Sequence, residues 1–225
     1  VTLNAETNLF SVGGDFNLDG TMTISTGTLD VDGDFDVDGS LTVSSTGRVQ
    51  IEDTSPDLST FSCGTGTVEF DGSSSFIAPA ETYYDLEIDG SNSAGVSLFG
   101  ATVTNSITVK TGSKLNIFPG DAYTLSTIDI NGILALSEVL TVTGLSDIDG
   151  TLALNADFNA DGEFDATSGE IQFPTSSASL MLSSTVTSLG TLSSLNISGD
   201  LDVDGTTETD ALTINGSALN YKTFG

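Results

Sequence analysis

The sequence contains no histidine and no tryptophan, and it has a single cysteine. Without histidine, nucleophilic catalysis assisted by an imidazole base is excluded. A zinc site of the common types is also disfavoured, because such sites are built from histidines and several cysteines. Cys63 has no partner within the chain for a disulfide, and we interpret it as a small buried apolar residue.

Basic residues are scarce: four Lys and Arg stand against 32 Asp and Glu, which gives a formal net charge of −28. Such a surface repels phosphate, so nucleic acid is not an expected partner, and anionic membrane surfaces are disfavoured for the same reason. Two interpretations of the acidic residues stay open. Either they form a solvated skin that keeps an extracellular protein soluble, or some of them bind divalent cations.

Long apolar runs are absent as well. None approaches the roughly 20 residues that span a bilayer, so insertion into a membrane is not expected. The chain begins at Val1 with no signal peptide after it, and we expect a mature product or a segment of a longer protein.

What the sequence does contain is an alternating stretch at residues 14–51. Apolar residues recur there at every second position, with aspartates between them. This period of two predicts extended chain with one buried face. Gly33 and Gly39 fall on the buried phase, and we interpret them as corners at which only a residue without Cβ fits. The apolar positions are Leu29, Val31, Phe35, Val37, Leu41 and Val43.

The pattern repeats along the chain. Residues 15–31 match residues 157–173 without a gap, and residues 34–51 give a further copy with one residue added before Gly47. A shorter signature, apolar-x-apolar-x-Gly-x-apolar-x-apolar, recurs with variations at 128–136, 145–154, 195–205 and 212–219. Repetition at a fixed period is typical of a solenoid, in which each coil stacks on the last.

We therefore predict an all-β fold, a single-stranded parallel β-helix (β-solenoid), right-handed, with roughly 19–20 residues per coil and about eleven coils. The alternative is an antiparallel sandwich or barrel, because Asp-Gly and Asn-Gly pairs are typical of hairpins. Hairpins do not place the bend glycine in phase with the buried residues, so the solenoid is favoured. We expect one elongated domain over 1–225, with flank loops near 53–66, 73–84 and 175–191.

Five aspartates on the exposed phase are the candidate metal ligands. Carboxylates stacked about 4.8 Å apart repel one another unless they are solvated, screened or bridged by cations. Ca²⁺ accepts about six to eight oxygen ligands in irregular geometry, so it is the ion that we expect if any binds. No cofactor is otherwise required. The candidate ligands are Asp30, Asp32, Asp34, Asp36 and Asp38.

A polysaccharide-processing enzyme is the alternative of another class. Asp34 and Asp36, alternate on one strand, would lie roughly 6–7 Å apart, within the range of glycosidase carboxylates. That spacing belongs to any Asp-x-Asp strand, and the four basic residues are scattered, so we do not expect an enzyme. Tyr83 and Tyr84 would form a glycan-stacking platform if exposed, but burial beside a loop is favoured.

Two stretches resemble known proteins. Within Gly66–Ile117, the runs GTVEFDG, YYDLEIDG and VTNSITVKTG look like the repeat regions of large bacterial surface proteins and adhesins. The run SLNISGDLDVDGTTETDALTINGSAL (Ser194–Leu219) resembles coils in fibre and tail proteins of marine phages. The resemblance implies a non-enzymatic structural or adhesive rod of a bacterial surface protein or filament, located outside the cell, or alternatively a virion protein such as a tail fibre. The implied partners are neighbouring subunits or domains of the same assembly, and glycans.

Overall fold

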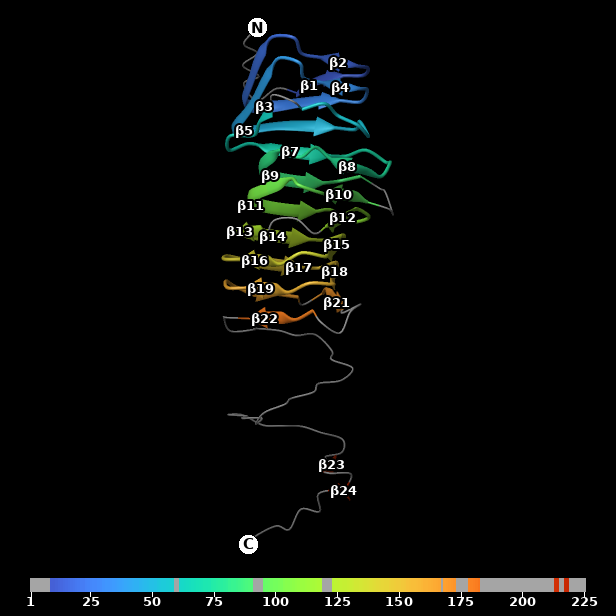
Figure 1. Ribbon diagram of the computed structural model, residues 1–225, viewed down its shortest axis with the longest axis vertical. Helices are drawn as coiled ribbons and strands as arrows, with labels where there is room; N and C mark the ends of the chain where they lie inside the picture. Colours follow the sequence, from blue (N-terminus) through green and yellow to red (C-terminus); the bar gives the residue numbers. More distant parts are fainter. Residues whose placement is uncertain are drawn as a thin grey trace. The chain divides into compact units, whose positions relative to one another are not determined.

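The computed structural model describes residues 9–58, 61–90, 95–118, 123–166, 168–172 and 178–182, together with two short strands near the C-terminus. The chain divides into two units, Val1–Gly190 and Thr191–Gly225. In the second unit, β23 (Thr213–Ile214) pairs antiparallel with β24 (Ser217–Ala218). The first unit consists of stacked turns of parallel strands (Figure 1). No helix in the described residues is long and apolar enough to cross a membrane.

Three parallel sheets form the first unit over most of its described length. The largest has the order β1-β3-β5-β7-β9-β11-β14-β17-β20, and β6 also pairs with β5. The strands of this ten-stranded sheet are β1 (Leu9–Val12), β3 (Thr21–Val31), β5 (Ser40–Ile51), β6 (Phe61–Ser62), β7 (Thr67–Phe70), β9 (Thr82–Ile88), β11 (Thr102–Val109), β14 (Thr127–Ile130), β17 (Ser146–Ile148) and β20 (Phe164–Asp165).

The two other sheets are smaller and flank the first in Figure 1. The six-stranded sheet contains β8 (Phe76–Ala78), β10 (Val96–Leu98), β12 (Lys114–Ile117), β15 (Ile133–Leu136), β18 (Thr151–Leu154) and β21 (Glu170–Gln172). The four-stranded sheet contains β13 (Tyr123–Leu125), β16 (Leu140–Val142), β19 (Phe158–Ala160) and β22 (Leu180–Leu182). Near the N-terminus, β2 (Phe16–Asn17) pairs with β4 (Phe35–Asp36). A turn such as β13, β14 and β15 therefore contributes one strand to each sheet.

The predicted fold class is confirmed. The first unit is an all-β solenoid of about eight turns, without a helix in its described residues. Its turns differ in length, since Tyr123 pairs with Leu140, whereas Phe158 pairs with Leu180. The first of these steps is shorter than the predicted period and the second is longer.

Two details of the predicted solenoid are not tested. The predicted copy at 195–205 and most of that at 212–219 lie outside the described residues. The total of eleven coils therefore stays a prediction, as does the right hand.

Inward-facing apolar side chains stack into one continuous core. In the ten-stranded sheet, Leu29 of one turn lies beside Val49 of the next and Val68 of the one after, and all three are at most 1% exposed. The alternation predicted for residues 29–43 is confirmed, because its six apolar positions are buried. Cys63 is buried too, as expected, with its thiol 3.2 Å from the carbonyl oxygen of Gly66.

The corner glycines are confirmed, and the structure gives their physical reason. A Cβ on Gly33 would lie 2.4 Å from the carbonyl carbon of Gly14, and a Cβ on Gly39 would lie 1.9 Å from the carbonyl oxygen of Gly20. Neither Gly33 nor Gly39 has a positive φ. The requirement for glycine is therefore the close approach of the preceding turn, rather than an unusual backbone angle.

The residue added before Gly47 forms a β-bulge. In the pairing of β3 with β5, Ile24 lies beside Val43 and Thr26 lies beside Thr46, so β5 has one residue more than β3 between these two pairs. Ser45 lies at this shift and has a φ of 55°, in the left-handed region. A bulge absorbs one extra residue locally, so the turns on either side stay in register.

Two of the predicted flank loops contain strands, which corrects their assignment. The segment 73–84 includes β8 and the beginning of β9, and the segment 53–66 includes β6. Pro79 does not interrupt the wall of the solenoid, because it follows β8, whose Phe76 and Ala78 are buried and pair with β10. Of the segment 175–191, the structure describes only residues 178–182, which include β22.

Gly39→Ala tests the close approach between turns, with Gly20→Ala as the matched control. Both glycines follow an aspartate at a corner, but a Cβ on Gly20 meets no atom within 4 Å. Because the preceding turn must move away from the new methyl group, we expect Gly39→Ala to lower the free energy of unfolding by about 1–3 kcal/mol. Gly20→Ala should lower it by no more than about 0.5 kcal/mol. Equal losses in urea denaturation would contradict the constraint.

Candidate functional site

Carboxylates concentrate on the outward surface of the ten-stranded sheet. One outward position in each turn pairs with its equivalent in the next, and these positions form a column along the stack. Asp or Glu fills six of the nine positions, which are Ser11, Asp30, Gln50, Glu69, Glu87, Thr108, Asp129, Asp147 and Asp165.

A second column lies at the adjacent corner. Each of its residues follows the strand and donates its backbone N–H to a carbonyl oxygen of the preceding turn, and the members are Asp32, Glu52, Asp71, Asp89, Lys110, Asn131 and Asp149. We call the two columns, together with Arg48 beside them, the acidic face. Successive carboxylates in a column are about 4.8 Å apart along the stack, at which distance their charges repel.

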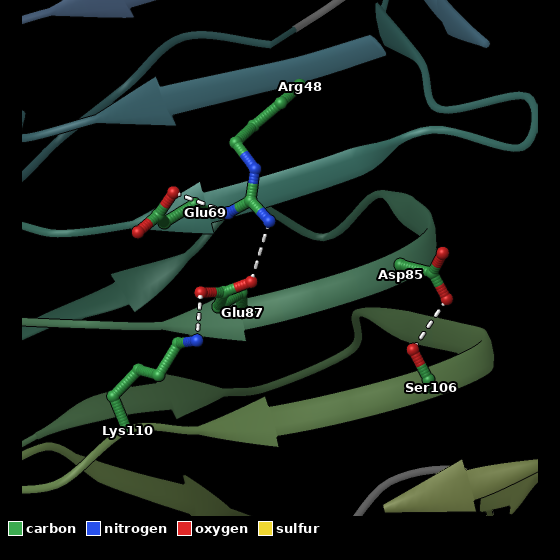
Figure 2. A network of polar contacts seen from close by, with 6 residues as sticks. All are labelled: Arg48, Glu69, Asp85, Glu87, Ser106 and Lys110. Carbon is green, nitrogen blue, oxygen red and sulfur yellow. Dashed lines mark hydrogen bonds and ion pairs between the residues drawn. The ribbon is translucent and has the colours of Figure 1, made fainter. Parts of the chain in front are cut away.

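A network of ion pairs lies within the acidic face (Figure 2). The guanidinium of Arg48 donates from Nη1 to Oε2 of Glu69 at 2.5 Å and from Nη2 to Oε2 of Glu87 at 2.9 Å. Nζ of Lys110 lies 2.9 Å from the other carboxylate oxygen of Glu87. The four side chains come from β5, β7, β9 and the residue after β11, so the network joins four successive turns.

Glu69 and Glu87 point outward and are nevertheless almost buried, with side chains 4% and 12% exposed. Burial raises the pKa of Glu69, although Arg48 contacts it. Burial acts in the same direction on Glu87, but the hydrogen bonds and charges of Arg48 and Lys110 outweigh it and lower the pKa of Glu87. The stability of both carboxylates as anions therefore depends on two basic side chains.

Glu69, Glu87 and Asp89 are the residues that could hold a metal ion, within the part of the chain that the structure describes. One carboxylate oxygen from each lies within 4.8 Å of the others. Two of the three are already bound by Arg48 or Lys110, which supply the positive charge that a cation would bring. The arrangement is therefore better explained by ion pairing than by a metal centre.

Sequence reasoning missed this group. Glu69 is the single acidic residue of β7, Glu87 shares β9 with Asp85, and the two glutamates are separated by a whole turn. The sequence does contain a signal for this group, because both glutamates lie in the same pattern, apolar-Glu-apolar-Asp-Gly. The first run is Val-Glu-Phe-Asp-Gly, which ends at Gly72, and the second is Leu-Glu-Ile-Asp-Gly, which ends at Gly90. Equal distance from a corner glycine places both glutamates at the same position of successive turns.

The five predicted metal ligands lie along a single turn and not one above another. Asp30 and Asp32 belong to the acidic face, whereas Asp34, Asp36 and Asp38 lie beyond the corner, on and beside β4. The described residues bring no three of them within the mutual distance that a shared ion requires. Calcium binding at these aspartates stays a prediction, which unfolding with and without EDTA would test.

Some aspartates of this region bond to the backbone of a neighbouring turn. Oδ1 of Asp15 accepts the backbone N–H of Asp34 at 3.2 Å. Oδ2 of Asp53 accepts the backbone N–H of Phe35 at 3.0 Å. Such bonds satisfy peptide groups at and beside the corners, so these carboxylates have a structural role that needs no ion.

Asp34, Asp36, Asp53 and Asp57 line a hollow of about 350 Å³ on the outside of β4. Burial and the neighbouring carboxylates, Asp38 first among them, raise the pKa of Asp36. Stacking of acidic groups thus has an electrostatic cost here that the ion pairs of the acidic face do not relieve.

Tyr83 does not form a glycan-stacking platform. Its side chain is fully buried, and its hydroxyl donates to the carbonyl oxygen of Pro79 at 2.9 Å. The rings of Phe61 and Phe70 pack against it, with centroids 6.1 and 5.9 Å away. Tyr84 is half-buried against the core. The expected burial is therefore confirmed for Tyr83.

Comparison with known proteins adds no family to this description. No protein-family model, no curated protein and no solved structure matches the chain. The resemblance to bacterial adhesins and phage fibres stays an interpretation of the sequence, whereas the β-solenoid rests on the observed strand pairing.

Asp71 gives the acidic face a pH dependence. Burial, followed by the charge of Glu69, raises the pKa of Asp71 from 3.8 to about 6. A folded-state pKa above the unfolded one means that stability is lost as the pH rises from about 4 to about 6. We expect Asp71→Asn to raise the unfolding midpoint at pH above about 7 and to change it little below pH of about 4. Glu170→Gln, on the six-stranded sheet, controls for net charge, and an equal effect of Glu170→Gln would contradict the assignment.

Arg48→Met tests the ion-pair network. Methionine keeps much of the apolar length of arginine but leaves Glu69 buried without its charged partner, so we expect the free energy of unfolding to fall by about 3 kcal/mol. Lys110→Met is the control, because the Lys110 side chain is 42% exposed and its loss should cost no more than about 1 kcal/mol. The double variant Arg48→Met, Glu69→Gln should recover part of the loss. Similar losses for both single variants would show that the burial of Glu69 does not matter.

Proposed function

We propose that the chain is a non-enzymatic structural and adhesive segment of an extracellular bacterial surface protein or filament, in which the solenoid acts as a spacer. The observation that carries the proposal is the continuity of the stack, since about eight turns share one core. Each turn of a solenoid contacts only its neighbours, so such a segment gains length without a larger core. Its outward side chains recur at regular intervals, which suits repeated contacts.

The charge of the chain supports an exposed, hydrated setting. A net charge of −28 keeps the surface soluble and disfavours nucleic acid and anionic lipid as partners. The ion pairs of Arg48 and Lys110 add cohesion between turns in a chain whose single cysteine is buried. We propose that no cofactor is required, and that the partners are neighbouring subunits or domains of the same assembly.

A tail fibre or another structural protein of a virion is the alternative function. The resemblance of residues 194–219 to phage fibre coils favours it. Anchoring distinguishes the two, because a surface protein requires a secretion signal and an anchor in its full-length gene, and a virion protein requires neither.

Antibody labelling of intact source cells tests the proposed location. An antibody against the purified chain should label unpermeabilised cells, and brief external protease treatment should remove the label while a cytosolic marker protein survives. Label that appears only after permeabilisation would contradict the proposal. Label on released virus particles instead of cells would establish the alternative. Turnover of acidic or neutral polysaccharides by the purified chain would contradict the non-enzymatic part.

A further inference from the structure

The outward surface of the six-stranded sheet differs chemically from the acidic face. This surface belongs to β8, β10, β12, β15, β18 and β21, which stack along one side of the solenoid (Figure 1). We call it the neutral face. Among the outward positions of these described strands, only Lys114 and Glu170 carry charge, and their charges cancel. The neutral face thus lacks the repulsion that dominates the ten-stranded sheet.

Three large apolar side chains are exposed together at the neutral face: Ile77 lies on β8, and Phe99 and Phe118 directly follow β10 and β12. Ile77 is 65% exposed, Phe99 is 61% exposed and Phe118 is 43% exposed. With Ser97 they line one hollow of about 270 Å³. A wider hollow of about 470 Å³ adjoins it, lined in part by Ser97 and Asn116. Single exposed apolar residues are ordinary, but a contiguous group of aromatic and aliphatic side chains is typical of an interaction surface.

We propose that the neutral face binds the same face of a second copy of this chain. In a two-fold dimer each copy presents the same surface, so the surface must tolerate its own charge. Two acidic faces repel one another, whereas two neutral faces do not. A two-fold axis that passes between β10 and β12 would place Phe99 of each copy over Phe118 of the partner subunit.

The area of the neutral face that is in contact limits the strength of the dimer. With the axis between β10 and β12, the four strands β8, β10, β12 and β15 of each copy face those of the partner subunit. Spaced by about 4.8 Å and each about 10–13 Å long, they present a flat surface of roughly 230 Å², so two copies cover about 460 Å² before the side chains are counted. This lies below the standard size of a specific protein interface, so the contact belongs among weak, transient ones. The dimer is therefore weak, and it strengthens with salt, because salt screens the repulsion between two chains of net charge −28.

Sedimentation equilibrium of the purified chain tests the proposal. We expect a monomer–dimer equilibrium whose dissociation constant falls at least about threefold when NaCl rises from roughly 0.05 to 0.5 M. Ile77→Ser combined with Phe99→Ser should weaken the dimer at least about tenfold, because it removes exposed apolar surface without touching the core. Ser97→Glu should abolish the dimer by placing a carboxylate on each side of the two-fold axis. Circular dichroism confirms that each variant stays folded.

Matched variants on another sheet distinguish dimerisation through the neutral face from nonspecific association. Met181→Ser removes an apolar side chain that is 48% exposed on β22, and Thr141→Glu adds a carboxylate on β16. Both should leave the dissociation constant unchanged. A chain that stays monomeric at every salt concentration would overturn the proposal and leave the neutral face to a partner of another kind. So would a dimer that the Met181 and Thr141 variants weaken as much as the Ile77, Phe99 and Ser97 variants. Neither result would affect the proposed spacer function.

Discussion

Hydrogen bonding between successive turns is the interaction on which the rest of the structure depends. Backbone N–H groups of one turn donate to carbonyl oxygens of the turn before, as from Thr151 to Gly132 at 2.8 Å. These bonds hold equivalent positions side by side although the turns differ in length. Extra residues are absorbed at corners or in a bulge such as that at Ser45, and glycines fill the points where two turns pass too closely for a Cβ.

The same register determines the chemistry of the surface. A side chain that points outward lies about 4.8 Å from its equivalent in the next turn, so acidic residues in phase must repel one another. Where Arg48 reaches across from the neighbouring column, two glutamates become almost buried and ion-paired. Burial and neighbouring carboxylates, Asp149 first among them, raise the pKa of Asp147 in the same column. The solenoid therefore contains columns of carboxylates that repel one another, and its few basic residues reduce this repulsion locally.

The fold was predictable from the sequence because each of its requirements leaves a local pattern. Alternation gives the buried phase, and a glycine on that phase, such as Gly39, marks a corner. The candidate site was less predictable. The run of aspartates around Asp34 is conspicuous in the sequence but spreads along one turn, whereas Glu69 and Glu87 are inconspicuous and meet across turns. Contacts between turns depend on register, which bulges and corners of variable length shift in ways that composition does not reveal.

The match between residues 15–31 and 157–173 shows why a pattern alone does not assign a residue to a face. Leu29 aligns with Ile171, yet Leu29 lies in the ten-stranded sheet and Ile171 in the six-stranded sheet. Strands of more than one sheet combine the same apolar alternation with a glycine at the corner. A repeated sequence segment can therefore lie in one sheet in one turn and in another sheet in a later turn, although its pattern is unchanged. Inward positions are not affected by this shift, because an apolar side chain packs into the core from any of the sheets. Outward positions are affected, because the sheet in which the segment lies determines whether its carboxylates belong to the acidic face or add charge to the neutral face. The separation of charge between faces is therefore a property of the stacked register, and a turn that gained or lost a residue would disturb this separation before it disturbed the core.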